Sequence, residues 1–177
     1  QVRQKLLDVF GWERGEYRFY PGENAVIDIV LPPEIDSFLG RRGVRVLREY
    51  PELLEAQLRA LLNVSRQFCI GILIPMVTTE RDVVEIAAQL HELADDMGIR
   101  EVPRLGAMIE TPAAALSIPV LKQHVDFFSI GSNDLTQYTL AAERGNPELV
   151  SFADGLHPSV LMLIRDVIDA AHAHKKH

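Results

Sequence analysis

Apolar runs and amphipathic segments alternate along most of the chain. Runs with the length and composition of buried strands occupy residues 68–77, 105–109 and 127–130. Apolar residues recur at helical spacing between and after these runs, in segments that begin near Pro51, Glu80 and Pro158. A strand followed by a helix, repeated about five times, predicts a parallel α/β fold of the barrel type.

The N-terminal part of the chain carries a weaker pattern. Three short elements are expected there, a helix end at 1–10 and strands at 17–20 and 26–31. The dipeptide Pro21-Gly22 predicts a turn between the two strands. No sequence repeat or low-complexity linker divides the chain, so we expect a single domain.

Helix boundaries are marked by capping residues and prolines. Thr79 predicts the start of the second amphipathic helix, and Gly98 predicts its end. Thr111 and Pro112 suit the N-cap and the first turn of the next helix. Pro119 lies further along the same segment and should kink it, because proline cannot donate the intrahelical hydrogen bond.

A polar cluster follows the apolar run at 127–130. Gly131 interrupts the run, and three polar residues come directly after it. The last of them, Asp134, has with Gln137 the spacing of an N-cap residue and its N3 partner, which predicts a helix start. Polar groups at the carboxyl end of a buried parallel strand are typical of active sites in α/β folds.

Glu110 occupies the same place in the preceding unit, directly after the run at 105–109. Glu110 and Asp134 are 24 residues apart, the length of one strand, helix and loop. Because adjacent parallel strands end at the same edge, we expect both carboxylates at one rim. Mg²⁺ is bound in proteins by one or two carboxylates together with substrate oxygens. The sequence therefore predicts a Mg²⁺ site at Glu110 and Asp134, although Asp134 taken alone could serve only as a helix cap.

Composition narrows the function classes. With 177 residues and 47% hydrophobic content, the chain can bury a substantial core, and its net charge of −7 argues against non-specific nucleic-acid binding. Cys69 is the single cysteine, so no internal disulfide can form; a cytoplasmic protein with a buried, inert thiol is expected. No apolar run reaches the roughly 18 residues of a membrane helix, and no membrane insertion is expected. Since the first residue is Gln1 rather than Met, we expect a piece of a longer protein.

Two long motifs resemble a known family. They are Gly-Ala-Met-Ile-Glu-Thr-Pro-Ala-Ala-Ala at 106–115 and Val-Asp-Phe-Phe-Ser-Ile-Gly-Ser-Asn-Asp-Leu-Thr-Gln-Tyr-Thr at 125–139. Both resemble the C-terminal barrel of the phosphoenolpyruvate-utilising enzymes, and within them the Enzyme I type of the sugar phosphotransferase system. The Thr-Pro after Glu110, the Gln-Tyr after Asp134 and the run Arg-Gly-Asn at 144–146 favour that type.

The resemblance implies an incomplete TIM-type (β/α)8 barrel. A complete barrel has about 250 residues, so this chain would hold roughly strands 2–6. Strands 1, 7 and 8, the cysteine that protonates the product and the phosphohistidine domain would lie outside it. The chain alone is then expected to be inactive, and no catalytic residue is assigned within it.

The implied reaction moves the phosphoryl group of phosphoenolpyruvate to a protein histidine with Mg²⁺, as the first step of sugar phosphotransfer. The implied partners are phosphoenolpyruvate, a histidine-bearing phosphocarrier protein reached through the missing domain, and a second copy in a homodimer. None of the six histidines of this chain matches the family's phosphorylated one.

The resemblance also implies substrate-binding residues, namely Asn133, Arg144, Arg42 and Arg18. Arg42 lies in Phe-Leu-Gly-Arg-Arg-Gly-Val-Arg at 38–45, which matches the family's third strand region, but two neighbouring arginines could supply the same charge. Arg18 is followed by Phe-Tyr-Pro-Gly-Glu-Asn, where the family has a glycine-rich loop with Asp and Lys.

Two alternative functions remain open at this point. The altered loop after Arg18 would suit a degenerate barrel kept for dimerisation or ligand sensing. A Mg²⁺-dependent carbon–carbon lyase of the wider phosphoenolpyruvate/pyruvate superfamily would also use two carboxylates. The adjacent pair Asn133 and Asp134, together with Arg144, argues against the lyase.

Overall fold

A single parallel sheet lies at the centre of the protein. The computed structural model describes residues 25–28, 42–143 and 145–173. Four strands lie in the order in which they occur along the chain: β1 (Ala25–Asp28), β2 (Ile70–Ile74), β3 (Arg104–Ile109) and β4 (Phe127–Ile130). Every neighbouring pair is parallel, with Ile72 opposite Leu105 and Ile109 opposite Ile130. The prediction of an α/β fold with a parallel sheet is confirmed.

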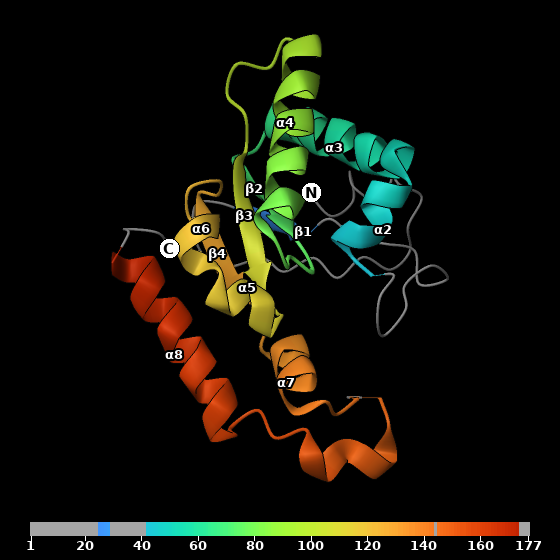
Figure 1. Cartoon of the computed structure of the whole chain (residues 1–177). Coiled ribbons are helices and arrows are strands. Elements are labelled where there is room, and N and C mark those ends of the chain that lie inside the picture. The colour runs from blue at the N-terminus through green and yellow to red at the C-terminus, as the bar shows by residue number, and fades with distance from the viewer. Residues whose placement is uncertain (1–24, 29–41, 144, 174–177) are drawn as a thin grey trace.

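Helices connect the strands and extend beyond the last one (Figure 1). They are α2 (Val44–Glu49), α3 (Pro51–Ser65), α4 (Glu80–Asp96), α5 (Pro112–Leu116), α6 (Ile118–Leu121), α7 (Ser132–Leu140), the 3-10 helix η2 (Pro147–Phe152) and α8 (Pro158–Ala173). In Figure 1 the arrowhead of β3 points toward α5, and α7 lies beyond this carboxyl end of the sheet. Helix α8 then returns alongside α5 and α6.

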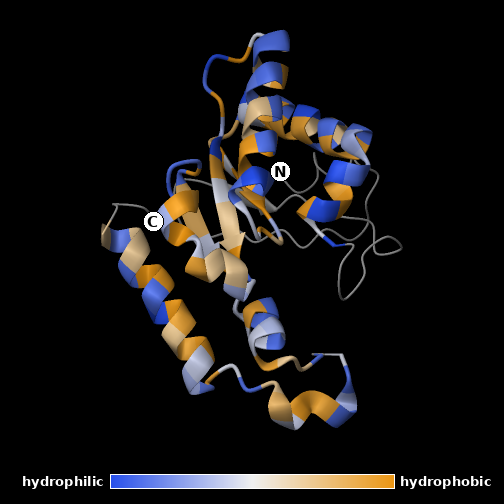
Figure 2. Cartoon of the chain, viewed as in Figure 1, coloured by the Kyte–Doolittle hydropathy of each residue, from blue (hydrophilic) through white to orange (hydrophobic). Residues whose placement is uncertain are grey.

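The helices pack on one face of the sheet. Alternate residues of β2 and β3, such as Ile72 and Ala107, belong to the same core as the buried faces of α3, α4 and α5. Figure 2 shows the corresponding alternation of hydrophobic and hydrophilic residues along α4 and α8. Each fully buried leucine or isoleucine of this core, such as Leu58 or Leu90, contributes about 1.5–3 kcal/mol relative to an exposed one.

The opposite face carries a separate, smaller cluster of Leu73, Met108 and Phe127. Glycines of the neighbouring strands make room for its aromatic ring. A Cβ on Gly106 would overlap the ring of Phe127, and one on Gly71 would lie 3.1 Å from it. Side chains alternate between faces along a strand, so this second face leads directly to the residues after β3 and β4.

Most of the predicted helix boundaries are confirmed. Thr79 is the N-cap of α4, and Gly98 ends that helix with a φ of +65°, a conformation that glycine adopts without strain. Thr111 caps α5 by accepting a hydrogen bond from the N–H of Ala114 at 3.1 Å. The segment around Pro119 is broken rather than kinked: α5 ends at Leu116, and Pro119 lies in the first turn of the separate helix α6.

Several boundaries differ from the sequence-based expectation. Strand β2 begins at Ile70, so Cys69 lies before it and is exposed, and the predicted burial of this thiol is wrong. The segment 38–45 resembles a strand region of the family; its last two residues, Val44 and Arg45, begin helix α2, and 38–41 lie outside the described residues. In β4 only Phe127 is buried, because this strand is the last of the described sheet. The elements expected at 1–10 and 17–20 lie outside the described residues, and strand 26–31 is described only over Ala25–Asp28.

None of the helices in the described ranges is long and apolar enough to cross a membrane.

Candidate active site at the carboxyl end of the sheet

Glu110 is the first residue after β3, and its side chain is buried, with 4% of the residue exposed. It follows Met108 by two residues, so the alternation of the strand assigns it to the face of the smaller cluster. The backbone N–H of Met76 donates a hydrogen bond of 2.6 Å to Oε1 of Glu110. A buried carboxylate is thus oriented by a backbone donor from the loop after the neighbouring strand.

Met76 holds this donor in an uncommon backbone conformation. Its φ is 57°, in the left-handed region that residues other than glycine rarely adopt. The segment that leads into α2 packs closely against it: Gly43 has a φ of +54°, and a Cβ there would lie only 2.6 Å from the Cβ of Met76. Gly43 is therefore required both by its conformation and by the close approach to Met76.

Asp134 lies in the first turn of α7 and is 9% exposed. The sequence predicted Asp134 as the N-cap of this helix, and this prediction is wrong. The N-cap is Gly131, and the helix begins at Ser132. The spacing to Gln137 produces a different contact, because Nε2 of Gln137 donates to Oδ1 of Asp134 at 3.3 Å within the helix. Residues three apart on a helix are neighbours, so the same spacing fits both arrangements. A carboxylate in the first turn is also favoured by the helix dipole.

Arg42 lies directly against Asp134. Its Nη1 donates to Oδ1 at 3.1 Å and its Nη2 to Oδ2 at 3.3 Å, so the two planar groups meet with two parallel hydrogen bonds. Nη1 also lies 3.2 Å from the hydroxyl of Tyr138, one turn further along α7. The side chains of Arg42 and Asp134 are 20% and 12% exposed, so this ion pair is partly shielded from water. Such charge-assisted double contacts are stronger than neutral hydrogen bonds.

The carboxyl ends of β3 and β4 meet at Gly131. The N–H of Gly131 donates to the carbonyl of Ile109 at 3.0 Å. A Cβ on Gly131 would lie 2.7 Å from the Cβ of Glu110 and 2.9 Å from its Oε2. The Glu110 carboxylate therefore occupies the space that a side chain at the start of α7 would need. Glu110 and the first turn that carries Asp134 are neighbours at this rim.

Of the remaining predicted substrate residues, Asn133 lies in the described part of the chain. Asn133 is exposed in the first turn of α7, next to Asp134. Arg144 and Arg18 lie outside the described residues. Of the six predicted site residues, the structure thus brings Glu110, Asp134, Arg42 and Asn133 to the same end of the sheet.

The donor set at this rim suits a hard cation that takes few protein ligands. Among the described residues, no group of three or more histidine, cysteine, aspartate or glutamate side chains is assembled for a metal. Mg²⁺ commonly takes one or two carboxylates and completes its coordination with water and substrate oxygens. Glu110 and Asp134 supply two carboxylates from adjacent units, and the absence of a side chain at Gly131 provides the room that the Glu110 carboxylate occupies. These residues fit the predicted ion.

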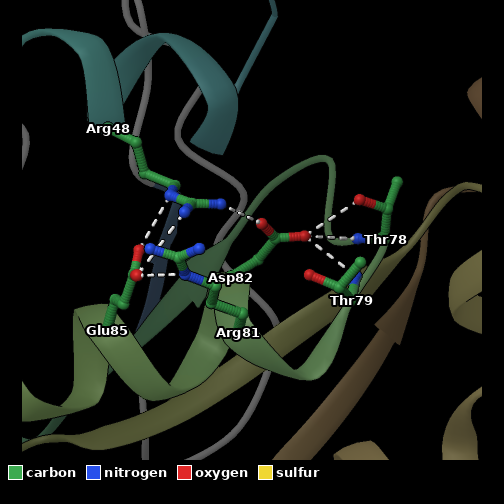
Figure 3. A network of polar contacts seen from close by, with 6 residues as sticks. All are labelled: Arg48, Thr78, Thr79, Arg81, Asp82 and Glu85. Atoms are coloured by element: carbon green, nitrogen blue, oxygen red, sulfur yellow. Dashed lines mark hydrogen bonds and ion pairs between the residues drawn. The ribbon is translucent and has the colours of Figure 1, made fainter.

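The structure contains a second polar network that the sequence did not predict. Arg48 of α2 contacts Asp82 and Glu85 of α4, and Asp82 also binds Thr78 and Thr79 (Figure 3). The only local signal was the spacing of Thr79 and Asp82, which is that of a capping box. Burial raises the pKa of Asp82, but the hydrogen bonds from Thr78 and Thr79 outweigh it and hold this pKa below its usual value.

A family profile and individual protein sequences are similar to this chain over most of its length. The family profile described as "PEP-utilising enzyme, PEP-binding domain" matches residues 14–177. A multiphosphoryl transfer protein of Xanthomonas campestris pv. campestris is 45% identical over 156 residues, which are 88% of this chain and 18% of that protein. A phosphoenolpyruvate-protein phosphotransferase of Haemophilus influenzae is 42% identical over 162 residues, or 88% of this chain and 28% of that protein. The chain therefore spans under a third of either relative.

A solved structure shares the fold. A citrate lyase of Burkholderia xenovorans LB400 superposes with a TM-score of 0.59 and 19% sequence identity, over 99% of this chain and 49% of that one. At this level of identity the similarity shows the fold alone.

Proposed function

Because the chain belongs to the phosphoenolpyruvate-binding domain family of the phosphoenolpyruvate-utilising enzymes, we propose that it binds phosphoenolpyruvate and Mg²⁺ for phosphoryl transfer to a protein histidine. Similarity to the phosphoenolpyruvate-protein phosphotransferase of Haemophilus influenzae supports this reaction. The acceptor would belong to another domain or to a phosphocarrier protein, in the first step of sugar phosphotransfer. The parent protein would act in the cytoplasm as a homodimer.

The described sheet is compatible with the wall of a (β/α)8 barrel. Its strands are parallel and follow one another in chain order, as barrel strands do. The helices that share the main core pack on one face, whereas an open doubly wound sheet has helices on both faces. The opposite face, with Leu73, Met108 and Phe127, would then line the barrel interior and lead to Glu110.

The observation that carries the proposal is the meeting of Arg42 and Asp134 next to Glu110. Two carboxylates from adjacent strand–helix units suit one Mg²⁺ ion, and an arginine beside them suits the phosphate of an anionic substrate. When bound, Mg²⁺ would neutralise charge on the phosphate and carboxylate oxygens of phosphoenolpyruvate. Phosphoryl transfer asks for positioning and charge stabilisation more than for covalent chemistry by the protein.

Each residue of the site has a distinct task in this proposal. The N–H of Met76 orients the Glu110 carboxylate through Oε1, and this carboxylate would hold the ion. Gln137 steadies Asp134, and Arg42 balances its charge in the absence of metal. With substrate present, Arg42 would share its donors with the phosphate, and Asn133 would add an amide from the start of α7. Arg144 and Arg18 are the further substrate arginines that the family resemblance implies.

Equilibrium binding of phosphoenolpyruvate to the full-length protein tests the proposal. Glu110→Gln and Asp134→Asn should each weaken Mg²⁺-dependent binding at least about tenfold, since each removes a charged ligand of the ion. Glu92→Gln, an exposed carboxylate on α4, is the matched control and should bind like the wild type. Unchanged binding in both site variants would contradict the proposal. Formation of phosphohistidine on a phosphocarrier protein, without carbon–carbon cleavage, would exclude the lyase alternative.

A further inference from the structure

A buried carboxylate outside the candidate site, that of Asp82, connects two segments that position residues of the site. Asp82 lies in the first turn of α4 and is 3% exposed. Its Oδ1 accepts a hydrogen bond of 3.2 Å from Nη1 of Arg48, which belongs to α2. Its Oδ2 accepts from the N–H and hydroxyl of Thr78 at 3.0 and 2.9 Å, and from the N–H of Thr79 at 2.9 Å. Figure 3 shows the carboxylate between these two sets of donors.

The loop on one side of Asp82 orients Glu110. Thr78 and Thr79 close the connection between β2 and α4, and Met76 lies two residues before Thr78 in the same connection. The N–H of Met76 is the donor that holds Oε1 of Glu110. The three hydrogen bonds to Oδ2 of Asp82 therefore fix the loop that presents this donor in its left-handed conformation.

The helix on the other side of Asp82, α2, begins two residues after Arg42. Helix α2 has only six residues, its N-cap Gly43 offers no side-chain hydrogen bond, and its first turn holds no acidic residue. A helix this short is not stable by itself and depends on contacts with the rest of the protein. Buried Val44, Val46 and Leu47 attach one face of it to the core. Arg48 adds polar contacts to this attachment, with Nε 2.7 Å from Oε2 of Glu85 in addition to its contact with Asp82.

The two sides meet again at the site, because Gly43 packs directly on Met76. A displacement of α2 would therefore move Arg42 away from Asp134 and release the contact that confines Met76. A capping role for Asp82 in α4 accounts for the hydrogen bonds to Oδ2. It does not account for the contact of Oδ1 with an arginine from another helix.

We infer that Asp82 and Arg48 are positioning residues for the phosphoenolpyruvate site, acting through Met76 on Glu110 and through Gly43 on Arg42. The inference rests on the proposed function, since it gives Glu110 and Arg42 their tasks. Neither Asp82 nor Arg48 touches the substrate in this arrangement. The pair sets the distance between the residue that would hold the ion and the arginine that would meet the phosphate.

The decisive variant is Arg48→Gln, which breaks the connection to α2 and leaves every hydrogen bond to Oδ2 of Asp82 in place. Arg81→Gln is the matched control, because Arg81 is an exposed arginine of α4 that contacts Glu85 within the same helix. Both variants are made in the full-length protein. The readouts are the dissociation constant of phosphoenolpyruvate with Mg²⁺, the thermal midpoint, and amide hydrogen exchange of the peptide that contains Met76.

Arg48→Gln should weaken binding about fivefold or more and speed exchange at Met76, because its loop would lose a fixed neighbour. Arg81→Gln should leave both values at the wild-type level. Arg48→Lys should recover part of the affinity, since lysine keeps the charge but not the forked contact. Adding Asp82→Asn to Arg48→Gln should cost less than the sum of the single effects on binding.

Binding at the wild-type level in Arg48→Gln, with only a lower thermal midpoint, would overturn the inference and leave a purely structural ion pair. Should Arg48→Gln not fold, Arg48→Lys decides by the same readouts. Glu110→Gln is measured in parallel. If Glu110→Gln loses binding and Arg48→Gln keeps it, only the positioning role is rejected. If Glu110→Gln binds like the wild type, the proposed function and this inference are rejected together.

Discussion

Arg42 and Asp134 are 92 residues apart in the chain, and their side chains meet through two hydrogen bonds of 3.1 and 3.3 Å. The sequence indicated separate tasks for them, one on the substrate and one on the metal. Their contact means that the negative charge of Asp134 is balanced when no ion is bound. Binding of Mg²⁺ and phosphate would exchange this ion pair for contacts of each partner with the ligand.

Replacing Arg42 tests whether this arginine, rather than a neighbour, serves the phosphate. Arg42→Ala should weaken binding of phosphoenolpyruvate at least about tenfold, since a charge-assisted hydrogen bond contributes about 1.5–3 kcal/mol. It should also destabilise the protein by roughly 1–3 kcal/mol, because Asp134 loses its counter-charge in a partly buried place. Arg45→Ala, which removes an exposed arginine of α2, serves as the control in the same titration and denaturation experiments. If Arg45→Ala weakened phosphoenolpyruvate binding more than Arg42→Ala, Arg45 rather than Arg42 would be the arginine that binds the phosphate.

A side chain at Gly131 should disturb the site directly. Gly131→Ala introduces a Cβ at 2.7 Å from the Cβ of Glu110, and neither atom lies at the end of a flexible chain. We expect a loss of about 1–3 kcal/mol in unfolding free energy and weaker Mg²⁺-dependent binding of phosphoenolpyruvate. Gly155→Ala is the matched control, since its Cβ would make an ordinary contact of 3.6 Å with Oγ1 of Thr136. Equal behaviour of the two variants would show that Glu110 is not confined by Gly131.

The lowered pKa of Asp82 predicts a pH dependence of stability. Because hydrogen bonds from Thr78 and Thr79 hold the pKa of Asp82 in the folded protein below its usual value, ionised Asp82 stabilises the fold at neutral pH. This contribution should persist above about pH 4 and disappear as the pH falls further, through the folded-state pKa. Arg48, Arg81 and Glu85 are the charged groups around this carboxylate (Figure 3).

Denaturant unfolding of Asp82→Asn and wild type gives the test. The variant should be clearly less stable at about pH 7, and the difference should narrow at about pH 3. Asp95→Asn, an exposed aspartate on the same helix, should change stability by no more than about 0.5 kcal/mol at either pH. A difference for Asp82→Asn that grows on acidification would contradict the depressed pKa.

Arg144 remains a prediction from the family motif. In the full-length protein, Arg144→Ala should lower kcat/KM for phosphoenolpyruvate at least about tenfold, the effect of removing one charged contact to phosphate. Arg165→Ala, an exposed arginine on α8, should leave the value unchanged. An unchanged value for Arg144→Ala would make it an ordinary surface residue.

Most of the described helices and strands could be predicted from strong local signals in the sequence. The apolar runs at β3 and β4 and the threonine caps of α4 and α5 are properties of neighbouring residues, so they are visible without a structure. The carboxyl-end positions of Glu110 and Asp134 follow from the same alternation. Local spacing was ambiguous at Asp134, where a cap pair and a pair within the first turn have the same separation.

The features that could not be predicted depend on contacts between distant segments. The contact of Arg42 with Asp134 and that of Arg48 with Asp82 join segments whose relative placement no local pattern encodes. The need for glycine at Gly43 arises from its close approach to Met76, 33 residues later in the sequence. The exposure of Cys69 depended on a single boundary, since β2 begins one residue after it.

The most direct test of the central claim is a crystal structure of the full-length protein with phosphoenolpyruvate and Mn²⁺ in place of Mg²⁺, with the ion located by anomalous diffraction. We expect one ion within about 2.2 Å of a carboxylate oxygen from both Glu110 and Asp134, with the Arg42 guanidinium turned to the phosphate. An ion bound elsewhere, or bound substrate with Arg42 still hydrogen-bonded to Asp134, would contradict the proposed site.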